Sequence, residues 1–359
     1  MSSSTNPAVD LAEVEQFQEK VVRDTSGLTI TVMSAIGDKL GLFKRLSSHG
    51  PTESEAFARK AGIDHRYAEE WLSIMTAGGY IHYDPQAREY SLPSAHARVL
   101  AEEGGPFFLG GTHQMLYGML DVLDLVERAF LTGEGVPMSA YGADTWEGME
   151  RDMNGVYNAK LLHEWMPAMP QVASMLEEGV DVADVGCGSG RILIMLAQSY
   201  PNSNYMGFDL FEPVLDRARA NALEEGVQDS IDFKVLDAEQ GLPNKFDIVM
   251  TFEVVHDAAQ PVRLLTAIRK SLKEGGRYIC MDIECEEGLE DNRGPLATAR
   301  YGASILYCMS TSLANEGVAL GTMGLHDAKM KELCMEAGFK SVRKVPLEGS
   351  IHSIYDASA

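Results

Sequence analysis

The segment Asp184–Gly190, with the sequence Asp-Val-Gly-Cys-Gly-Ser-Gly, constrains the fold more than any other part of this chain. A short apolar run, Val182–Val185, leads into its glycines, and a helical pattern of apolar residues follows from Ile192. A glycine-rich turn between a buried strand and a helix is typical of Rossmann-type nucleotide-binding domains. The glycine spacing is shorter than that of dinucleotide sites, and Asp184 would repel a diphosphate but attract a cation. The segment therefore predicts a Rossmann-type turn that holds a positively charged ligand.

Residues 179–359 are predicted to form one α/β domain, because strand and helix patterns alternate along them. Short apolar strands that alternate with helices indicate a parallel-rich sheet with helices on both faces. The predicted strands are Val182–Val185, Tyr205–Phe208, Ile231–Val235, Phe246–Phe252 and Tyr278–Ile283. The predicted helices between them are Ile192–Ser199, Pro213–Glu225 and Pro261–Leu272.

An acidic residue stands at the end of each of the first three predicted strands: Asp184, Asp209 and Asp237. The carboxyl ends of parallel strands meet at one edge of a sheet, so these carboxylates would share one crevice. There Asp209, 19 residues after Gly190, can accept from ribose hydroxyls, and Asp237 from an adenine amino group. Each acid alone could instead cap a helix or a turn. The predicted cofactor-binding residues are Asp184, Gly186, Gly188, Gly190, Asp209, Leu210, Asp237, Ala238 and Phe252.

Residues 1–105 are predicted to form a mainly helical domain. Apolar residues recur at helical spacing from Val14 to Leu46, and another helix is expected over His65–Ala77. Two short strand patterns follow, at Tyr80–Tyr83 and Arg88–Leu92. Helix, turn, helix and hairpin is the order of elements in a winged helix.

The formal net charge of −23 weighs against nucleic-acid and membrane partners. Proteins bind phosphate backbones and anionic lipids chiefly through Lys and Arg. A winged helix reads DNA with its second helix, but here that helix carries Glu69 and Glu70 against Arg66. A structural or dimerising role is therefore expected for this domain. A ligand-sensing transcriptional regulator is the alternative from another functional class.

The motifs of residues 179–359 together resemble those of class I S-adenosylmethionine-dependent methyltransferases. The resemblance rests on the glycine turn and on Gly207–Leu210, Asp237-Ala238 and Phe246–Val249. It implies that S-adenosylmethionine, which carries a sulfonium and an ammonium, is the cofactor. The front half is similar to that of small-molecule O-methyltransferases, whose winged-helix domains form an interlocked homodimer. The resemblance thus implies a homodimeric enzyme of small-molecule biosynthesis that methylates a hydroxyl oxygen.

Within that family the base is often a histidine in an apolar-His-Asp-Trp motif, nine residues after the acid of strand four. His256 stands at this spacing from Asp247, and an unperturbed histidine pKa near 6.5 suits proton removal. The family orients this histidine with an acid at the end of the next strand, which corresponds to Asp282. Two positions depart from the pattern, because Ala258 replaces the Trp and Lys329 stands where a second acid is expected.

The sequence leaves the acceptor atom open. Transfer to a neutral thioether needs no base, and the chain is also similar to the S-methyltransferases of dimethylsulfoniopropionate synthesis, which methylate a small hydroxy-acid thioether. The acceptor site is expected to lie between the apolar stretch 300–309 and residues 106–178, which are predicted to form a helical linker and roof. The candidate substrate residues are Tyr141, His163, Trp165, Arg300, Tyr301 and Tyr307.

Neither a metal site nor a membrane-spanning segment is expected. The nine histidines are scattered, without tight His or Cys pairs. No apolar run approaches the roughly 20 residues that cross a bilayer, and the N-terminus lacks the layout of a signal peptide. The five cysteines are odd in number and lie mostly in apolar stretches, which favours a reduced, cytoplasmic protein.

Overall fold

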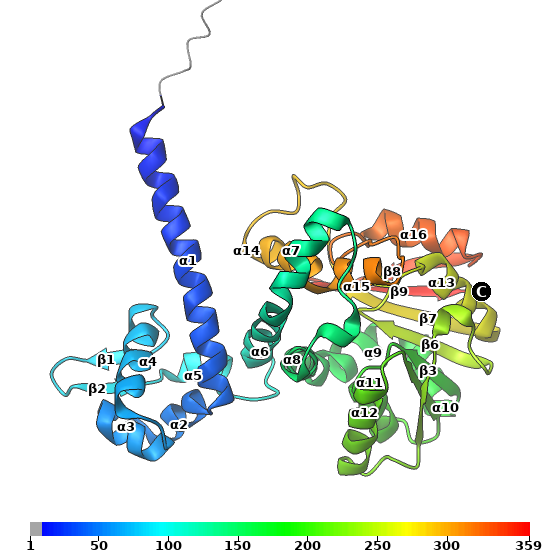
Figure 1. Ribbon diagram of the computed structural model, residues 1–359. Coiled ribbons are helices and arrows are strands. Elements are labelled where there is room, and N and C mark those ends of the chain that lie inside the picture. The colour runs from blue at the N-terminus through cyan, green and yellow to red at the C-terminus, as the bar shows by residue number, and fades with distance from the viewer. Residues whose placement is uncertain (1–8) are drawn as a thin grey trace, which may run out of the picture. The chain divides into compact units, whose positions relative to one another are not determined.

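The computed structural model describes residues 9–359 and divides into two compact units, with the boundary between Tyr117 and Gly118 (Figure 1). The first unit has the element order of a winged helix, and its hairpin pairs Tyr83 with Tyr90. Its elements are α1 (Leu11–Lys39), α2 (Leu42–His49), α3 (Ser54–Ala61), α4 (His65–Ala77), β1 (His82–Asp84), β2 (Glu89–Ser91), α5 (Ser94–Leu100) and α6 (Gly110–Met119), within which the boundary falls.

Trp71 on α4 organises the core of the first unit. Its ring packs edge-on against Phe43 of α2, with centroids 5.0 Å apart, and stacks on Phe57 of α3 at 6.1 Å. Its indole N–H donates to the Met33 carbonyl on α1 at 3.0 Å. One aromatic side chain therefore ties four helices together and satisfies its own polar group.

Helix α1 leaves apolar side chains uncovered in the single chain. Phe17 is 66% exposed and Leu28 is 56% exposed, and Val14 and Val21 share the same side of the helix. The buried residues of α1 are confined to its last turns, at Ser34, Ala35 and Gly37. Contiguous exposed apolar patches are typical of interaction surfaces.

The second unit is built on a seven-stranded sheet with the order β5-β4-β3-β6-β7-β9-β8 (Figure 1). Every strand except β9 runs in the same direction, and β9 is antiparallel to both of its neighbours. The α/β class predicted from sequence is confirmed, although the last two strands carried no assignment there. The strands are β3 (Asp181–Val185), β4 (Asn204–Asp209), β5 (Ile231–Val235), β6 (Phe246–Phe252), β7 (Leu272–Ile283), β8 (Ser341–Val345) and β9 (His352–Ser358).

Helices cover both faces of this sheet. Successive strand residues enter opposite cores, as Val182 and Ala183 of β3 do, because side chains alternate across a strand. One core also contains α10, α11 and α12, and the other contains α13 and α16. The helices of this unit are η1 (Leu120–Val122), α7 (Leu123–Thr132), η2 (Met138–Ala140), α8 (Ala143–Lys160), η3 (Leu161–Trp165), α9 (Met166–Ala168), α10 (Pro170–Glu178), α11 (Arg191–Ser199), α12 (Glu212–Glu224), η4 (Ala238–Gln240), α13 (Pro261–Ser271), α14 (Pro295–Ala303), η5 (Ser304–Cys308), α15 (Met309–Ala314) and α16 (Asp327–Glu336).

Two of these segments, η3 and η5, are π-helical turns set within longer helical stretches. Such turns are rare and occur frequently at functional sites. One carries Trp165 and the other carries Tyr307 and Cys308. Across the described residues, no helix is both long and apolar enough to cross a bilayer.

Candidate active site

The glycine turn after β3 adopts a backbone that other residues rarely reach. Gly186, Gly188 and Gly190 have φ values of +72°, +51° and +76°. A Cβ atom on Gly186 would lie 2.5 Å from Val254, and one on Gly190 would lie 2.8 Å from Phe233. Nothing lies within 4 Å of a Cβ atom on Gly188, so the turn is packed at both ends and open in the middle. This geometry leaves backbone groups accessible to a ligand.

Asp209, the last residue of β4, holds the turn. One carboxylate oxygen accepts from the Gly188 N–H at 3.0 Å, and the other accepts from the Phe211 N–H at 3.1 Å. Burial raises the pKa of Asp209, and these backbone donors oppose that shift. Asp209 is therefore both a structural clasp for the turn and a carboxylate at the edge of the sheet.

Asp184 lies beside Asp209 and is only 2% exposed. Its Oδ1 atom is buried without a hydrogen-bond partner. Burial, and then the charge of Asp209, raise the pKa of Asp184 well above its usual range. A buried carboxylate with an unused oxygen is stabilised by a cationic ligand, so these residues fit a nucleoside that carries an ammonium and a sulfonium.

The other predicted cofactor residues differ in burial and in hydrogen bonding. Asp237 caps η4 by accepting from the Glu239 N–H at 3.0 Å, the capping arrangement that an isolated acid also adopts. Leu210 is 58% exposed, whereas Ala238 and Phe252 are buried. The Phe252 ring stacks on Trp165, with centroids 6.4 Å apart.

His256 and Asp282 form a buried pair at the same edge of the sheet. The His256 Nδ1 atom lies 2.7 Å from Asp282 Oδ1, and the two side chains are 4% and 0% exposed. Burial disfavours the charged imidazolium, but the Asp282 carboxylate and the Cys308 thiol outweigh it and hold the pKa of His256 well above its ordinary value. Because β6 and β7 are parallel neighbours, the loop after β6 and the end of β7 meet here.

The Glu253–His352 pair and Asp257, which were not among the predicted site residues, lie beside His256. Glu253 pairs with His352 of β9, with 2.9 Å between Oε1 and Nε2. Asp257 follows His256 directly, and its burial, together with nearby Asp282 and other carboxylates, raises its pKa to about 7 even though His256 opposes the shift. Glu253 could have been noticed from its place immediately after a strand, but no sequence signal marks His352.

Four aromatic rings pack together beside these acids. Tyr141 lies 5.0 Å from Tyr307, and Trp146 lies 5.8 Å from Tyr307 and 5.2 Å from Phe211, centroid to centroid. The Tyr141 hydroxyl donates to the Leu306 carbonyl at 2.6 Å. This cluster includes two predicted substrate residues, Tyr141 and Tyr307, and adds Trp146 and Phe211.

The remaining predicted substrate residues do not form one group. His163 is exposed, whereas Trp165, two residues later in the same π-helical turn, is 1% exposed. The Arg300 guanidinium donates to the carbonyls of Glu284 and Ile351, at 2.7 and 2.8 Å. Tyr301 is half-buried.

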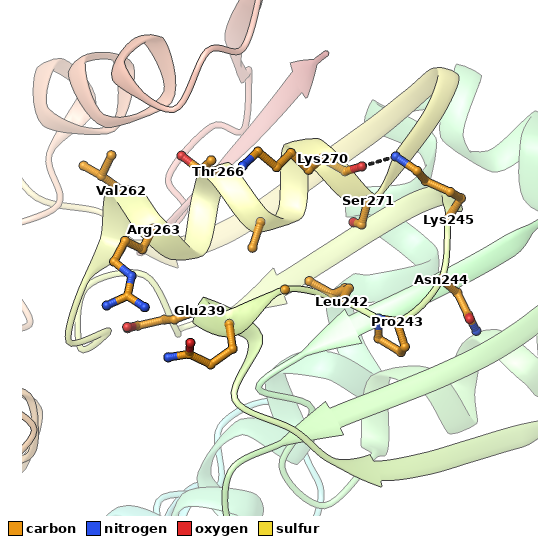
Figure 2. Close-up of a pocket in the computed structure, with 13 residues that line it drawn as sticks. Glu239, Leu242, Pro243, Asn244, Lys245, Val262, Arg263, Thr266, Lys270 and Ser271 are labelled. Carbon is orange, nitrogen blue, oxygen red and sulfur yellow. Dashed lines mark hydrogen bonds between the residues drawn. The ribbon is translucent and has the colours of Figure 1, made fainter.

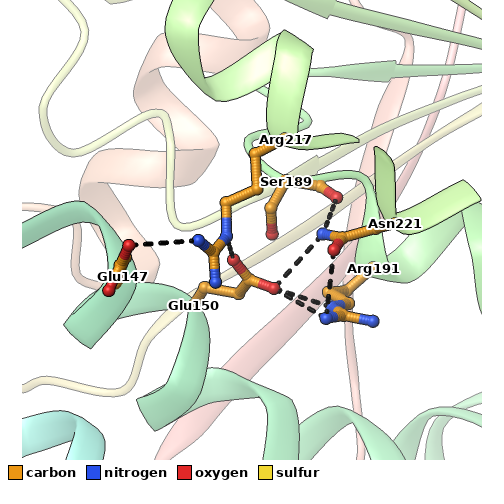
Figure 3. A network of polar contacts seen from close by, with 6 residues as sticks. All are labelled: Glu147, Glu150, Ser189, Arg191, Arg217 and Asn221. Atoms are coloured by element: carbon orange, nitrogen blue, oxygen red, sulfur yellow. Dashed lines mark hydrogen bonds and ion pairs between the residues drawn. The ribbon is translucent and has the colours of Figure 1, made fainter. Parts of the chain in front are cut away.

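Helix α8 is bound to the glycine turn through Glu150 (Figure 3). This carboxylate is 5% exposed and accepts from Arg191 Nε at 2.9 Å, from Arg217 and from Asn221 at 3.2 Å. Asn221 also donates to the Ser189 carbonyl at 3.0 Å, which connects the network to the turn itself. The network thus fixes a helix of the linker against the predicted cofactor site.

A separate cavity of about 660 Å³ lies between the segment 239–245 and α13 (Figure 2). None of the predicted site residues lines it. On its rim the Lys245 ammonium donates to the Lys270 carbonyl. The candidate active site is therefore defined by its carboxylates and histidines, not by this cavity.

Comparison with known proteins identifies two domains in the chain. A family model described as a methyltransferase domain matches residues 176–309, and an Rv2258c-like winged helix-turn-helix domain matches residues 28–102. The chain carries a methyltransferase domain. The glycine turn, Asp209 and the His256–Asp282 pair all lie within this domain, and the winged-helix domain precedes it.

Curated relatives of the methyltransferase domain include ubiquinone biosynthesis O-methyltransferases. The protein of Ruegeria sp. (strain TM1040) is 32% identical over 130 residues, which are 36% of this chain and 49% of the relative. That of Pseudomonas aeruginosa (strain UCBPP-PA14) is 32% identical over 122 residues, 33% of this chain and 47% of the relative. The chain spans about half the length of these relatives.

Solved structures resemble the whole chain. Mitomycin 7-O-methyltransferase MmcR superposes with a TM-score of 0.72 at 17% identity, over 98% of this chain and 100% of that chain. Human N-acetylserotonin methyltransferase, in complex with SAM, has a TM-score of 0.65 at 19% identity, over 100% and 99%. At these identities the likeness concerns the fold.

The clasp formed by Asp209 predicts that replacing it weakens cofactor binding. We expect Asp209→Ala to raise the dissociation constant for S-adenosylmethionine by about tenfold or more, because the charge-assisted hydrogen bonds to Gly188 of the turn and to Phe211 are lost. Isothermal titration calorimetry measures this directly. Asp232→Ala is the matched control, because it removes an exposed carboxylate that pairs with Lys234; both residues lie on β5. Unchanged affinity in Asp209→Ala would contradict the placement of the cofactor.

The Glu150 network predicts a loss of stability when its carboxylate is neutralised. We expect Glu150→Gln to lower the free energy of unfolding by about 1–3 kcal/mol, because buried hydrogen bonds to a charged group are weakened. Urea denaturation provides the measurement. Glu164→Gln is the control, since its partner Lys160 forms an exposed pair that contributes about 0–1 kcal/mol. Equal effects of the two substitutions would show that the network does not anchor α8.

Proposed function

We propose that this protein transfers a methyl group from S-adenosylmethionine to a hydroxyl oxygen of a small molecule. The buried His256–Asp282 pair, with 2.7 Å between its polar atoms, is the observation that carries this proposal. In this proposal His256 is the base and Asp282 the acid that orients it, at the sheet edge that also bears the glycine turn. Transfer to oxygen requires removal of a proton, and this pair has the chemistry for that task.

Asp184, Asp209 and the glycine turn are the residues that would hold the cofactor. The unused oxygen of Asp184 suits the ammonium, and Asp209 and Asp237 stand at the strand ends where ribose and adenine groups would be recognised. When bound, S-adenosylmethionine supplies a methyl group activated by its sulfonium. The residues of the chain bind and orient this group and exclude water from it.

His256 would act as the base through its Nε2 atom. Because a carboxylate only accepts hydrogen bonds, Asp282 fixes the proton of His256 on Nδ1, so Nε2 is the nitrogen that would accept a proton, and Cys308 is a further hydrogen-bond partner of the ring. The neutral imidazole takes the hydroxyl proton, and Asp282 stabilises the imidazolium that forms. The family acid replaced by Lys329 is not needed for this step.

We further infer a cytoplasmic homodimer. The exposed apolar stripe of α1, with Phe17 and Leu28, supports a second copy of the chain as its partner. The five cysteines, all unpaired and buried, support a reducing compartment.

The proposed base predicts a loss of rate in His256→Ala. We expect the turnover number to fall by about 10² or more, because general-base catalysis contributes about that much. Release of S-adenosylhomocysteine with a hydroxyl acceptor is the measurement. A nearly unchanged rate would instead favour a thioether acceptor, which needs no base.

Asp282→Asn tests the same step through pH. In the parent protein, activity should rise with pH through the elevated pKa of His256, because only the neutral imidazole accepts a proton. Removing the Asp282 charge lowers that pKa, so the acidic limb of the profile should move to lower pH while the maximal rate falls. A limb that stays in place would argue against His256 as the base.

The proposed dimer predicts that a charge within the apolar stripe separates the subunits. We expect Phe17→Glu to shift the protein toward monomer, because burying a carboxylate in an apolar interface is costly. Light scattering coupled to size exclusion reports the mass. Gln16→Glu adds the same charge on the opposite side of α1 and should leave the dimer intact. A parent protein that is monomeric would overturn the proposal.

A further inference from the structure

Glu253, the first residue after β6, has an unusual backbone and a fixed side chain. Its φ is +56°, a left-handed conformation that residues other than glycine rarely adopt. The Glu253 N–H donates to the Met281 carbonyl at 2.8 Å, and its Oε1 atom pairs with His352 Nε2 at 2.9 Å. Backbone strain of this kind persists where the surrounding structure enforces it, often at functional sites.

The buried imidazole of His352 fixes the position of the Glu253 carboxylate. Its side chain is 3% exposed, and Trp165 packs edge-on against its ring with centroids 6.3 Å apart. The pair uses only one oxygen of Glu253, whose side chain is 25% exposed. Among the described residues, no hydrogen-bond donor reaches Oε2 of Glu253, so this oxygen is available to a ligand.

Both acidic and basic groups surround Glu253 and His256. Burial opposes ionisation of Glu253, but the hydrogen bond and charge of His352, together with His256 and Arg300, lower the pKa of Glu253 and keep its carboxylate ionised. The neighbouring Asp257 carboxyl likewise has no hydrogen-bond donor in the described part of the chain. Burial is the largest cause that raises its pKa to about 7; the charge of His256 opposes the shift, and those of Asp282, Asp209 and Glu253 add to it. Arg300 lies near Glu253, but its guanidinium donates to two backbone carbonyls. The ionised carboxylate of Glu253, with one oxygen unpaired, attracts a cation and repels an anion.

The aromatic cluster lies next to the same charges. Tyr307 interacts electrostatically with Asp257 and Asp209, and its ring contacts Tyr141 and Trp146. Aromatic rings pack well against a flat ring of a ligand and also attract cations. The acidic groups and the rings together suit a molecule that has both features.

We propose that Glu253, held by His352, binds a cationic amino group of the acceptor, so that the acceptor is an aromatic hydroxyl compound bearing an amine. This inference rests on the proposed function, because it names the substrate class of the same site. A neutral phenol or a hydroxy acid would leave the free oxygen of Glu253 without a partner, and the acid would also be repelled.

Three probes of nearly equal size test the charge preference. Tyramine is cationic, 4-ethylphenol is neutral, and 3-(4-hydroxyphenyl)propionate is anionic at pH 7. Their binding is measured by calorimetry on the full-length protein saturated with S-adenosylhomocysteine. We expect tyramine to bind about tenfold or more tightly than 4-ethylphenol, and the anion to bind most weakly. Equal binding, preference for the anion or binding of none of the probes would overturn the inference.

Glu253→Gln then assigns the preference to one side chain. It should remove most of the tyramine advantage while leaving the affinities for 4-ethylphenol and S-adenosylhomocysteine unchanged. Glu287→Gln, which neutralises an exposed carboxylate of the same domain, is the matched control and should retain the full preference. A preference that survives Glu253→Gln overturns the role of this residue.

Two further measurements keep the outcome unambiguous. Circular dichroism tests whether Glu253→Gln is folded. If it is not, Asp257→Asn replaces it as the test variant, and it should reduce the tyramine preference because it removes a carboxyl group next to the same amine. If Asp257→Asn also retains the preference, the inference fails. If the parent protein does not bind S-adenosylhomocysteine at all, the proposed function itself fails, whereas cofactor binding without a charge preference overturns only the substrate class.

Discussion

Two carboxylates held next to each other in a poorly solvated place are the constraint on which this site depends. Asp184 is buried with an unused oxygen. Asp209 lies beside it, with one oxygen bound to the Gly188 N–H of the glycine turn and the other to the Phe211 N–H. Each raises the cost of ionising the other group, so the site is most stable when a cation occupies it. The glycine turn has a left-handed backbone and is packed against Val254 and Phe233 at its ends, so only its middle is open to a ligand. The ligand chemistry follows from this arrangement.

The parallel order of the central strands brings the second half of the site to the same edge. His256 follows β6 and Asp282 lies near the end of β7, and these strands are neighbours. The antiparallel β9 begins at that edge, where its His352 is paired in register with Ile283 of β7. Two acid–histidine pairs thus come from three adjacent strands. A rigid sheet positions such groups more accurately than loops do.

Helix α8 of the linker is bound to the glycine turn. Glu150 of α8 reaches Arg191, Arg217 and Asn221, and Asn221 continues to the Ser189 carbonyl. The same helix carries Trp146, which joins the aromatic cluster around Tyr307. A change in the position of α8 would therefore affect the glycine turn and the aromatic cluster together.

The sequence by itself determined the α/β class, the glycine turn and the strand-end acids, and the pairing of His256 with Asp282 was implied by the family resemblance. The first three features depend on local patterns and on one general rule, that the carboxyl ends of parallel strands meet at one edge. Only the tertiary structure decided that Asp237 caps η4, that His163 is exposed, and that Arg300 binds backbone carbonyls. It also decided that Glu253 meets His352, 99 residues away in the chain. Contacts of that kind depend on the antiparallel return of β9, and no periodicity or spacing in the sequence encodes where a returning strand will dock.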